Sequence, residues 1–296
     1  GARARAADGA EFAIALRYLI DASGRDTFLG NRLKLKRKNP RHQSAALFSH
    51  FRGVRRRDGE NAGNITIERF ADGWVWMIPL PDDVMSIGAV CSPDHLKRRR
   101  GDSEAFLLDT LHGIPTVRER MAGAERVAPV HATGNYSYVS TRMTGPGWTT
   151  VGDAYVFIDP IFSSGVYLAM HSAERAAHMV DAILRDPTRE TALQRALRRD
   201  FDRGLREFSW FIYRVTNPTM RELFLGPRNV LRMKEALLSV LAGDIFGRTP
   251  IWHSLRAFKA LYYAICLFNP RRTWNAMRRR AFNIRAQDIG RSAARG

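Results

Sequence analysis

The sequence predicts an α/β protein in which a β-rich first half, built around a mixed sheet, is followed by a helical second half. Three observations indicate this class. Apolar and polar residues alternate through much of residues 44–91, the period of strands with one buried face. The segment Trp148–Gly152 has the composition of a strand and runs through a loop into a helical pattern. Helical periodicity continues after Pro187, with breaks only at Pro218, Pro227, Pro250 and Pro270.

Length and composition permit one large domain or two ordinary ones with a sizeable core. Of the 296 residues, 45% are apolar and 10% aromatic, which excludes a disordered chain. No uncharged apolar stretch approaches the roughly 20 residues of a spanning helix. Cys91 and Cys266 form no metal-binding spacing, so we expect no metal site and two reduced thiols in the cytoplasm. Because the chain starts at Gly1 without a signal peptide, we expect an upstream region to be missing.

The chain is strongly basic, with a formal net charge of +18 that comes mostly from arginine. Arginine triplets occur at 55–57, 98–100 and 278–280. Such charge attracts nucleic acid, acidic lipid, a phosphorylated cofactor or an acidic carrier protein. No known nucleic-acid module is present, and the aromatic residues are not interleaved with the basic runs. We therefore expect no nucleic-acid partner.

Turn residues divide the first half into short strands. Asp8-Gly9 favours a hairpin between two alternating stretches. Arg17–Asp21 is a short buried strand that ends in the small-residue turn Ala22-Ser23-Gly24. Between Ser44 and Cys91, breakers at 72–73 and 81–83 separate several strands of an antiparallel sheet.

Helices and strands then alternate before the helical half. Helices are expected at Ser103–His112 and Pro115–Met121, and strands near Arg126–His131 and Asn135–Ser140. Another helix opens at Ser163-Ser164-Gly165. Its spacing places on one face Val166, Met170, Ala173, Ala177, Val180 and Ile183–Leu184.

Two strand ends carry the residue types that bind cofactors. Asp21 closes a buried strand before three small residues, which lets a backbone approach a phosphate or ribose. Gly152-Asp153 follows the strand that begins at Trp148 and places a carboxylate at the end where α/β folds bind ligands. The helix start at Ser163–Gly165 could hold a halide or the negative charge of a reduced flavin. Taken by itself, this helix start is better explained by plain N-capping by the serines.

The third motif is Trp74-Val75-Trp76-Met77-Ile78-Pro79. Tryptophans at i and i+2 place both indoles on one face of a strand, and the proline is expected to end the strand at a sheet edge. Two core tryptophans on a strand are the simpler interpretation.

Together these motifs resemble the FAD enzymes of the aromatic-hydroxylase-like fold, and the tryptophan motif resembles that of flavin-dependent halogenases. The resemblance covers about Tyr18 to Asp186. It implies that 1–30 and 145–186 are the remainder of an FAD-binding domain, that 31–144 is a mixed substrate sheet, and that 187–296 is a helical region. A βαβ unit with a glycine-rich loop would precede them. The implied FAD contacts are Asp21, Ala22, Ser23, Gly24, Gly152, Asp153, Pro160, Gly165 and Val166.

The resemblance also implies a function. Reduced FAD from a partner flavin reductase, oxygen and a halide would halogenate a small aromatic substrate, with the halide on Ser164 and Gly165. Phe162 stands where tryptophan-acting members carry a glutamate, so a phenol or pyrrole, in some members tethered to a carrier protein, is expected. The active-site wall would comprise Trp74, Trp76, Ile78, Pro79 and Phe162. The catalytic lysine of the family would lie outside the chain, so this part alone is expected to be inactive.

Alternatives on the same scaffold are an FAD-dependent hydroxylase and an alkene reductase of the geranylgeranyl-reductase kind. His131 and His171 lie nearest the motifs, and a helical histidine such as His171 is more often structural than a base. The aromatic stretch at 251–268 and the arginines after it suit either contact with an anionic membrane or a helix over the substrate cavity, which we prefer.

Overall fold

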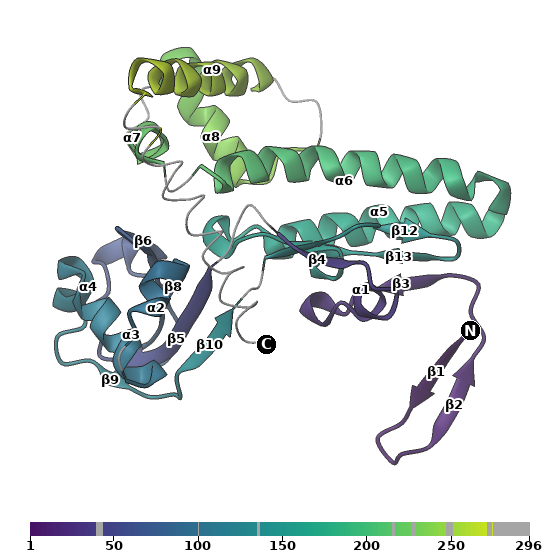
Figure 1. Ribbon diagram of the computed structural model, residues 1–296, viewed down its shortest axis with the longest axis horizontal. Helices are drawn as coiled ribbons and strands as arrows, with labels where there is room; N and C mark the ends of the chain where they lie inside the picture. Colours follow the sequence, from purple (N-terminus) through teal and green to yellow (C-terminus); the bar gives the residue numbers. More distant parts are fainter. Residues whose placement is uncertain are drawn as a thin grey trace, which may run out of the picture. The chain divides into compact units, whose positions relative to one another are not determined.

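The computed structural model describes residues 1–39, 44–99, 101–134, 137–214, 217–225, 229–246, 251–270 and 274 (Figure 1). The chain divides into two compact units, which are described separately below. Of the described residues, unit 1 comprises 1–39 and those from 137 to 274, and unit 2 comprises those from 44 to 134. Asn135, Pro227, Pro250 and the arginine triplet 278–280, which the sequence singled out, lie outside the described residues.

Unit 2 contains the antiparallel sheet expected between Ser44 and Cys91. Its strands run in the order β10-β5-β8-β7-β6, and β9 also pairs with β5. Their bounds are β5 (Ala45–Arg52), β6 (Thr66–Phe70), β7 (Gly73–Pro79), β8 (Val84–Cys91), β9 (Glu125–Arg126) and β10 (His131–Gly134). The breakers at 72–73 and 81–83 form the β6–β7 and β7–β8 turns.

One face of this sheet forms the core of unit 2. The helices of the unit are α2 (Pro93–Lys97), α3 (Ser103–His112) and α4 (Pro115–Arg120). Apolar side chains from alternate strand positions, such as Val75 and Ile87, pack with Leu107 and Leu111 of α3. Since side chains alternate along a strand, the neighbours of Val75 project from the opposite face.

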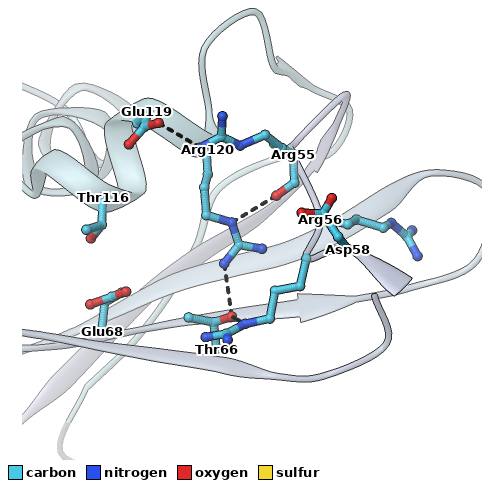
Figure 2. Close-up of a pocket in the computed structure, with 9 residues that line it drawn as sticks. Arg55, Arg56, Asp58, Thr66, Glu68, Thr116, Glu119 and Arg120 are labelled. Atoms are coloured by element: carbon cyan, nitrogen blue, oxygen red, sulfur yellow. Dashed lines mark hydrogen bonds and ion pairs between the residues drawn. The ribbon is translucent and has the colours of Figure 1, made fainter. Parts of the chain in front are cut away.

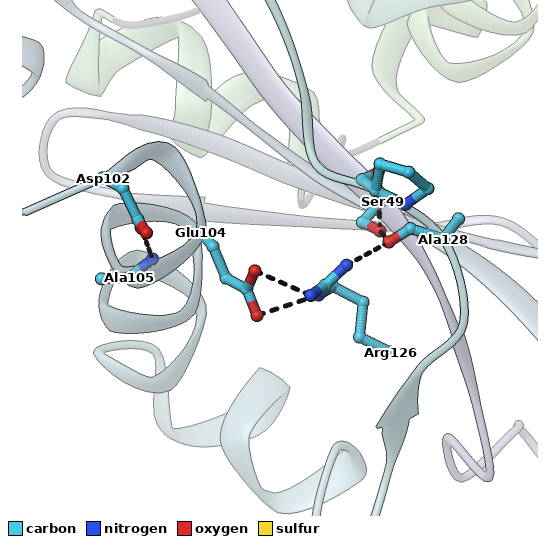
Figure 3. Close-up of polar contacts among 7 residues, drawn as sticks. Ser49, Asp102, Glu104, Ala105, Arg126 and Ala128 are labelled. Atoms are coloured by element: carbon cyan, nitrogen blue, oxygen red, sulfur yellow. Dashed lines mark hydrogen bonds and ion pairs between the residues drawn. The ribbon is translucent and has the colours of Figure 1, made fainter.

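Polar contacts fix α3 to β9, and through Arg126 to the residues that follow β9 (Figure 3). Asp102 caps α3 by accepting from the amide of Ala105 at 2.8 Å. The guanidinium of Arg126 donates to both oxygens of Glu104, at 3.1 and 2.7 Å, and this bidentate geometry is the stronger form of ion pair. The Ala128 carbonyl accepts from Arg126 and, at 2.7 Å, from Ser49.

Unit 1 holds three small sheets. β1 (Ala2–Arg5) and β2 (Glu11–Ile14) form the hairpin expected at Asp8-Gly9, with φ of +87° at Gly9. The second sheet has the order β12-β13-β3, with β12 (Thr144–Gly145), β13 (Trp148–Thr150) and β3 (Leu19–Asp21). The third has the order β14-β11-β4, with β14 (Val156–Phe157), β11 (Tyr138–Ser140) and β4 (Lys36–Lys38).

Helices form the rest of unit 1 (Figure 1). A short α1 (Phe28–Arg32) precedes β4, and the helical half comprises α5 (Gly165–Arg185), α6 (Glu190–Ile212), α7 (Pro218–Leu225), α8 (Met233–Leu241) and α9 (Trp252–Phe268). The long helices α5 and α6 lie side by side. α6 buries Leu197, Phe201 and Phe208, one apolar stripe at helical spacing, in the core of the unit.

The apolar face that the spacing identified on α5 is buried only toward the end of the helix, where Ile183 is buried and Val180 packs against the core. Toward the start of the helix, Val166 and Met170 are 74% and 68% exposed, and Ala173 and Ala177 are also exposed. The other buried residues of α5 are Ser172, Ala176 and Met179. Periodicity identifies an apolar stripe but not the neighbour that covers it. Here the adjacent loop at Gly152 packs against the small residues of α5.

The aromatic helix α9 belongs to the core of unit 1, where Leu255, Phe258 and Tyr262 are buried. Whether it covers a substrate stays a prediction. Within the described residues, no helix combines the length and the apolarity needed to cross a bilayer. Most of the basic stretch that we considered for membrane contact lies outside the described residues.

Candidate functional site

Two of the predicted cofactor elements meet at one edge of a sheet in unit 1. β3 and β13 are parallel neighbours, with Asp21 opposite Thr150. The amide of Val151 donates to the Asp21 carbonyl at 3.0 Å. Because parallel strands end at the same edge, the turn after Asp21 and the pair Gly152-Asp153 lie together, in short 3-10 turns η1 (Gly24–Asp26) and η3 (Gly152–Ala154).

The carboxylate of Asp21 organises its own loop. Asp21 is 4% exposed, and its two oxygens accept from the amides of Ser23 at 2.9 Å and Leu29 at 2.7 Å. Ala22 and Ser23 are exposed, and Gly24 adopts φ +62° with open space where a Cβ would project. Asp21 therefore supports the loop, and the direct FAD contact assigned to it stays a prediction.

Gly152 joins the β13 end to helix α5. Its φ is +52°, and a Cβ there would lie 2.8 Å from the Cβ of Ala169. Its amide donates to the fully buried Ser172 hydroxyl at 2.8 Å. Only glycine satisfies both the conformation and the close approach. The patterns in the sequence contain no signal for Ala169 or Ser172, whose roles depend on contacts across the fold.

Asp153 presents a carboxylate that nothing in the described residues engages by a hydrogen bond. Its side chain is half-buried, and burial raises the pKa of this carboxyl, while the charge of Arg25 partly offsets the effect. Its carbonyl accepts from the Tyr138 hydroxyl at 2.6 Å, and the Lys36 ammonium lies 4.1 Å from the centre of that ring. The carboxylate is thus held in place by its backbone and can accept from a ligand hydroxyl.

The start of α5 presents backbone amides to open space. Ser163 has a left-handed φ of +51°, and the buried Ser164 makes no side-chain capping bond. A Cβ at Gly165 would meet nothing within 4 Å. Within the described residues the amides of Gly165 and Val166 have no acceptor, as expected in the first turn of a helix. With the dipole of a 21-residue helix behind them, these amides suit an anion.

The loop before α5 packs toward the helical half. Asp159 accepts from the amide of Ile161 at 2.9 Å, which shapes the turn η4 (Pro160–Phe162). The Phe162 ring lies 5.8 Å from the ring of Phe224 on α7. Phe162 therefore has an apolar neighbour, and its role in the wall of an active site stays a prediction.

The tryptophan strand β7 has the predicted geometry. The rings of Trp74 and Trp76 are 5.8 Å apart on one face, while Val75 and Met77 are fully buried on the other. The indole N–H of Trp76 donates to the Ser86 hydroxyl at 3.2 Å. Across the strands, Gly88 leaves room for this indole, since a Cβ there would lie 2.3 Å from Trp76 Cζ2.

The prediction that Pro79 ends the strand at a sheet edge is wrong. β7 does end at Pro79, but it lies inside the sheet, between β6 and β8. Pairing with β6 stops at Met77, opposite Thr66, so Pro79 lies beyond the end of that neighbour. A proline is tolerated there because β6 requires no hydrogen bond from it.

The two histidines near the motifs have structural partners. The ring of His171 stacks on Phe246 at 3.7 Å, and its Nε2 lies 3.4 Å from an Asp200 oxygen. The ring of His131, in β10, lies 5.5 Å from that of Phe48. Neither arrangement indicates a catalytic base, and the structural role expected for His171 stays a prediction. The described residues contain no cluster of three or more groups that could hold a metal.

Unit 1 fits the flavin end of FAD. The Asp153 carboxylate, which has no hydrogen-bond partner within the described residues, suits the hydroxyls of a polyol, and Gly24 lets a ligand approach the backbone without meeting a side chain. The amides at the start of α5 suit a ring edge that carries negative charge. No Gly-x-Gly-x-x-Gly follows a strand in this sequence, so the chain itself offers no loop of that kind for the pyrophosphate.

Comparison with known proteins identifies relatives of the same character. The family model described as tryptophan halogenase matches residues 4–225. The flavin-dependent halogenase gsfI of Penicillium aethiopicum is 34% identical over 67% of this chain and 39% of its own length. The 1H-pyrrole-2-carbonyl-[peptidyl-carrier protein] brominase of Pseudoalteromonas luteoviolacea is 30% identical over 73% of this chain and 57% of its own length.

Solved structures agree with these relatives. The flavin-dependent brominase Bmp2 superposes with a TM-score of 0.76 at 25% identity, over 89% of this chain and 65% of that one. A flavoprotein/dehydrogenase from Cytophaga hutchinsonii, at 23% identity and a TM-score of 0.77, shows the same fold. The α/β fold of FAD enzymes predicted from the sequence is confirmed. The chain spans about two fifths of the fungal relative and less than two thirds of the bacterial brominases.

Proposed function

The chain belongs to the tryptophan halogenase family of flavin-dependent oxidoreductases, and on this basis we propose that it carries the halide and substrate side of an FAD-dependent halogenase. The proposed reaction uses reduced FAD, oxygen and a halide to halogenate an aromatic substrate of phenol or pyrrole type. The observation that carries the proposal is the set of open amides at Gly165 and Val166, in the same unit as the strand ends of β3 and β13.

Each residue of the site has a defined task in this proposal. Asp153 would accept a hydrogen bond from a hydroxyl of the flavin chain, and Gly24 would let the backbone approach the cofactor closely. The halide would lie against Ser164 and Gly165, where the Gly165 amide has no acceptor within the described residues, and the dipole of α5 would favour it. Bound reduced FAD would supply the electrons with which oxygen is activated and the halide converted to an electrophile. Ser172 and Ala169 would fix the Gly152 turn against the helix that carries the halide amides.

The substrate side is proposed to include the tryptophan face of β7. The partly exposed ring of Trp76 lies beside the ring of Trp74, which is only 6% exposed. This aromatic face would suit a flat aromatic ring and exclude water. Phe162 adds an apolar ring where a charged group would favour the amino group of an amino acid. A phenol or pyrrole therefore fits better than free tryptophan.

Partners follow from the same proposal. A flavin reductase would supply reduced FAD in the cytoplasm. A carrier protein that holds the substrate is supported by two bacterial relatives, whose names describe halogenation of a pyrrole-2-carbonyl group on a peptidyl carrier protein. The positive charge of this chain suits the acidic surface of such a carrier.

The test is mass spectrometry of product formed by the enzyme with a flavin reductase, FAD, NADH and oxygen. Phenolic and pyrrolic substrates, free and carrier-bound, are supplied with and without bromide. We expect brominated product only when bromide is present, with oxygen insertion as a minor outcome.

Two results would replace the proposal. Hydroxylated product with a yield that is independent of bromide would identify a monooxygenase. Reduction of a carbon–carbon double bond without oxygen would identify a reductase. Omission of the flavin reductase serves as the control, since product formation should then stop unless reduced FAD is added directly.

A further inference from the structure

An arginine-lined cavity of about 580 Å³ lies in unit 2, where the segment after β5, strand β6 and helix α4 meet (Figure 2). None of the residues assigned above to FAD, the halide or the tryptophan face lines it. Four arginines from two parts of the sequence contribute to its wall, namely Arg55, Arg56, Arg57 and Arg120.

Two of these guanidinium groups converge on one hydroxyl. Thr66 is 3% exposed, and its Oγ1 accepts from Arg57 Nε at 3.2 Å and from Arg120 Nη1 at 2.9 Å. Arg120 Nε also donates to the Arg55 carbonyl at 2.8 Å, so this guanidinium is fixed on two sides. Because Thr66 already accepts two hydrogen bonds, its own proton remains to be donated to a ligand.

Carboxylates do not neutralise this pair. Arg55 pairs with Glu119 at 2.8 Å, and Arg56 lies 3.9 Å from Asp83. In the described part of the chain, no carboxylate lies within ion-pair distance of Arg57 or Arg120. Burial and then the charge of Arg57 lower the pKa of Arg120, while Glu68, which also lines the cavity, opposes this. Two like charges are therefore held together, an arrangement that a bound anion would relieve.

We propose that this cavity binds the phosphoryl group of a phosphate monoester. Four arginines face three carboxylates in the lining, Asp58, Glu68 and Glu119. The phosphoryl oxygens would meet the two guanidinium groups that have no ion-pair partner within the described residues, and they match the planar donor forks of arginine. The hydroxyl of Thr66 can supply a further donor. The volume is in the range of small-molecule sites, which leaves room for the organic part of the ester beyond the phosphoryl group.

Isothermal titration of the chain with phenyl phosphate, at constant ionic strength in chloride, tests the proposal. We expect saturable binding that weakens at least tenfold in Arg57→Gln and in Arg120→Gln. The matched control is Arg118→Gln, because Arg118 lies on the same helix α4, is exposed and does not line the cavity. Circular dichroism establishes that each variant is folded. Should Arg120→Gln fail to fold, the exposed Arg57 still provides the test.

Additional variants and ligands distinguish a phosphoryl site from general attraction of anions. Thr66→Ser should keep the affinity, whereas Thr66→Val, which has the same shape without the hydroxyl, should weaken it. Inorganic phosphate should bind more weakly than phenyl phosphate, and acetate should not compete at equal concentration. Equal binding of inorganic phosphate would assign the cavity to the free ion. Equal loss in Arg118→Gln, or equal competition by acetate, would show general attraction to a basic surface. Each of these three outcomes overturns the proposal, and so does the absence of saturable binding.

Discussion

Glycine has opposite roles at two positions of the candidate cofactor site. At Gly152 the positive φ and the contact with Ala169 make a side chain intolerable, whereas Gly165 faces open space. One glycine is therefore required by the fold, and the other leaves room for a ligand.

This contrast predicts that Gly165→Val abolishes halogenation without loss of folding. We expect the free energy of unfolding to change by less than about 1 kcal/mol, because the new side chain meets nothing. Halogenation should fall at least about tenfold, while reduced flavin still consumes oxygen. Gly152→Ala should instead destabilise the chain by about 1–3 kcal/mol. Urea unfolding and bromide-dependent product formation measure the two effects. Normal halogenation by the Gly165→Val enzyme would show that the halide does not bind at the start of α5.

We predict that the Asp153 carboxylate lowers the stability of the chain in a pH-dependent way while it contributes to cofactor binding. Burial raises the pKa of this carboxyl, so its charged form opposes folding, and this cost disappears as pH falls and the group is protonated. Asp153→Asn should therefore melt slightly higher than the parent chain at pH 7 without ligand. The difference should shrink toward pH 4.

Asp153→Ala, which removes the acceptor, should weaken FAD retention in the enzyme by about 1.5–3 kcal/mol, as expected for a hydrogen bond to a charged group. Melting curves between pH 4 and 8 and equilibrium dialysis with FAD are the measurements. An unchanged affinity for FAD in equilibrium dialysis would leave Asp153 with only a structural role in its loop.

The strand β7 shows how an element positions a functional surface through its neighbours. Its alternation places Val75 and Met77 in the core and both indoles on the other face. The position of the Trp76 indole depends on a glycine in the adjacent strand β8, which stands opposite Trp76 in the register.

Gly88→Val should accordingly displace the Trp76 indole. The new side chain would occupy the space within 2.5 Å of both Trp76 and Phe48, with a loss of about 1–3 kcal/mol in stability. Tryptophan fluorescence should shift to the red as the indole becomes exposed. The control is Gly134→Val in β10 of the same sheet, where a Cβ would make only an ordinary 3.6 Å contact. Identical spectra for the two variants would contradict the packing described.

At the level of the whole chain, two separate cores accompany the two units. The core of unit 2 is built entirely from residues between Leu47 and Met121, and that of unit 1 from residues after Met143. Two cores in one chain predict that each unit can lose stability alone.

Hydrogen exchange of an Ile87→Ala variant tests this independence. Ile87 is fully buried in the core of unit 2, and its truncation should destabilise that unit by about 2–5 kcal/mol. Exchange should accelerate in β5, β7 and β8 and remain unchanged in α5 and α6. Ile67→Ala, at a 40% exposed position of the same sheet, should have little effect. Equal acceleration in both units would show a single cooperative unit.

Elements with local signals could be predicted from the amino-acid sequence alone. Alternation, turn residues and caps predicted the hairpin at Gly9, the strands between Ser44 and Cys91, and helix Ser103–His112 with the bounds observed. The motifs at 74–79, 152–153 and 163–165 were sufficient to predict the family that the comparisons confirm. These features depend on residues close together in the chain, where period and backbone preference act directly.

The neighbours that each element meets are set by the tertiary structure and could not be predicted in this way. Packing across the chain selected the buried face of α5, placed Pro79 inside a sheet, committed Asp21 to its loop, and brought Arg57 and Arg120 to one hydroxyl. The roles of Ser172 and Gly88 are likewise set by partners 20 and 12 residues away in sequence. Packing and desolvation depend on which distant segments meet, and a local pattern carries no information about that choice.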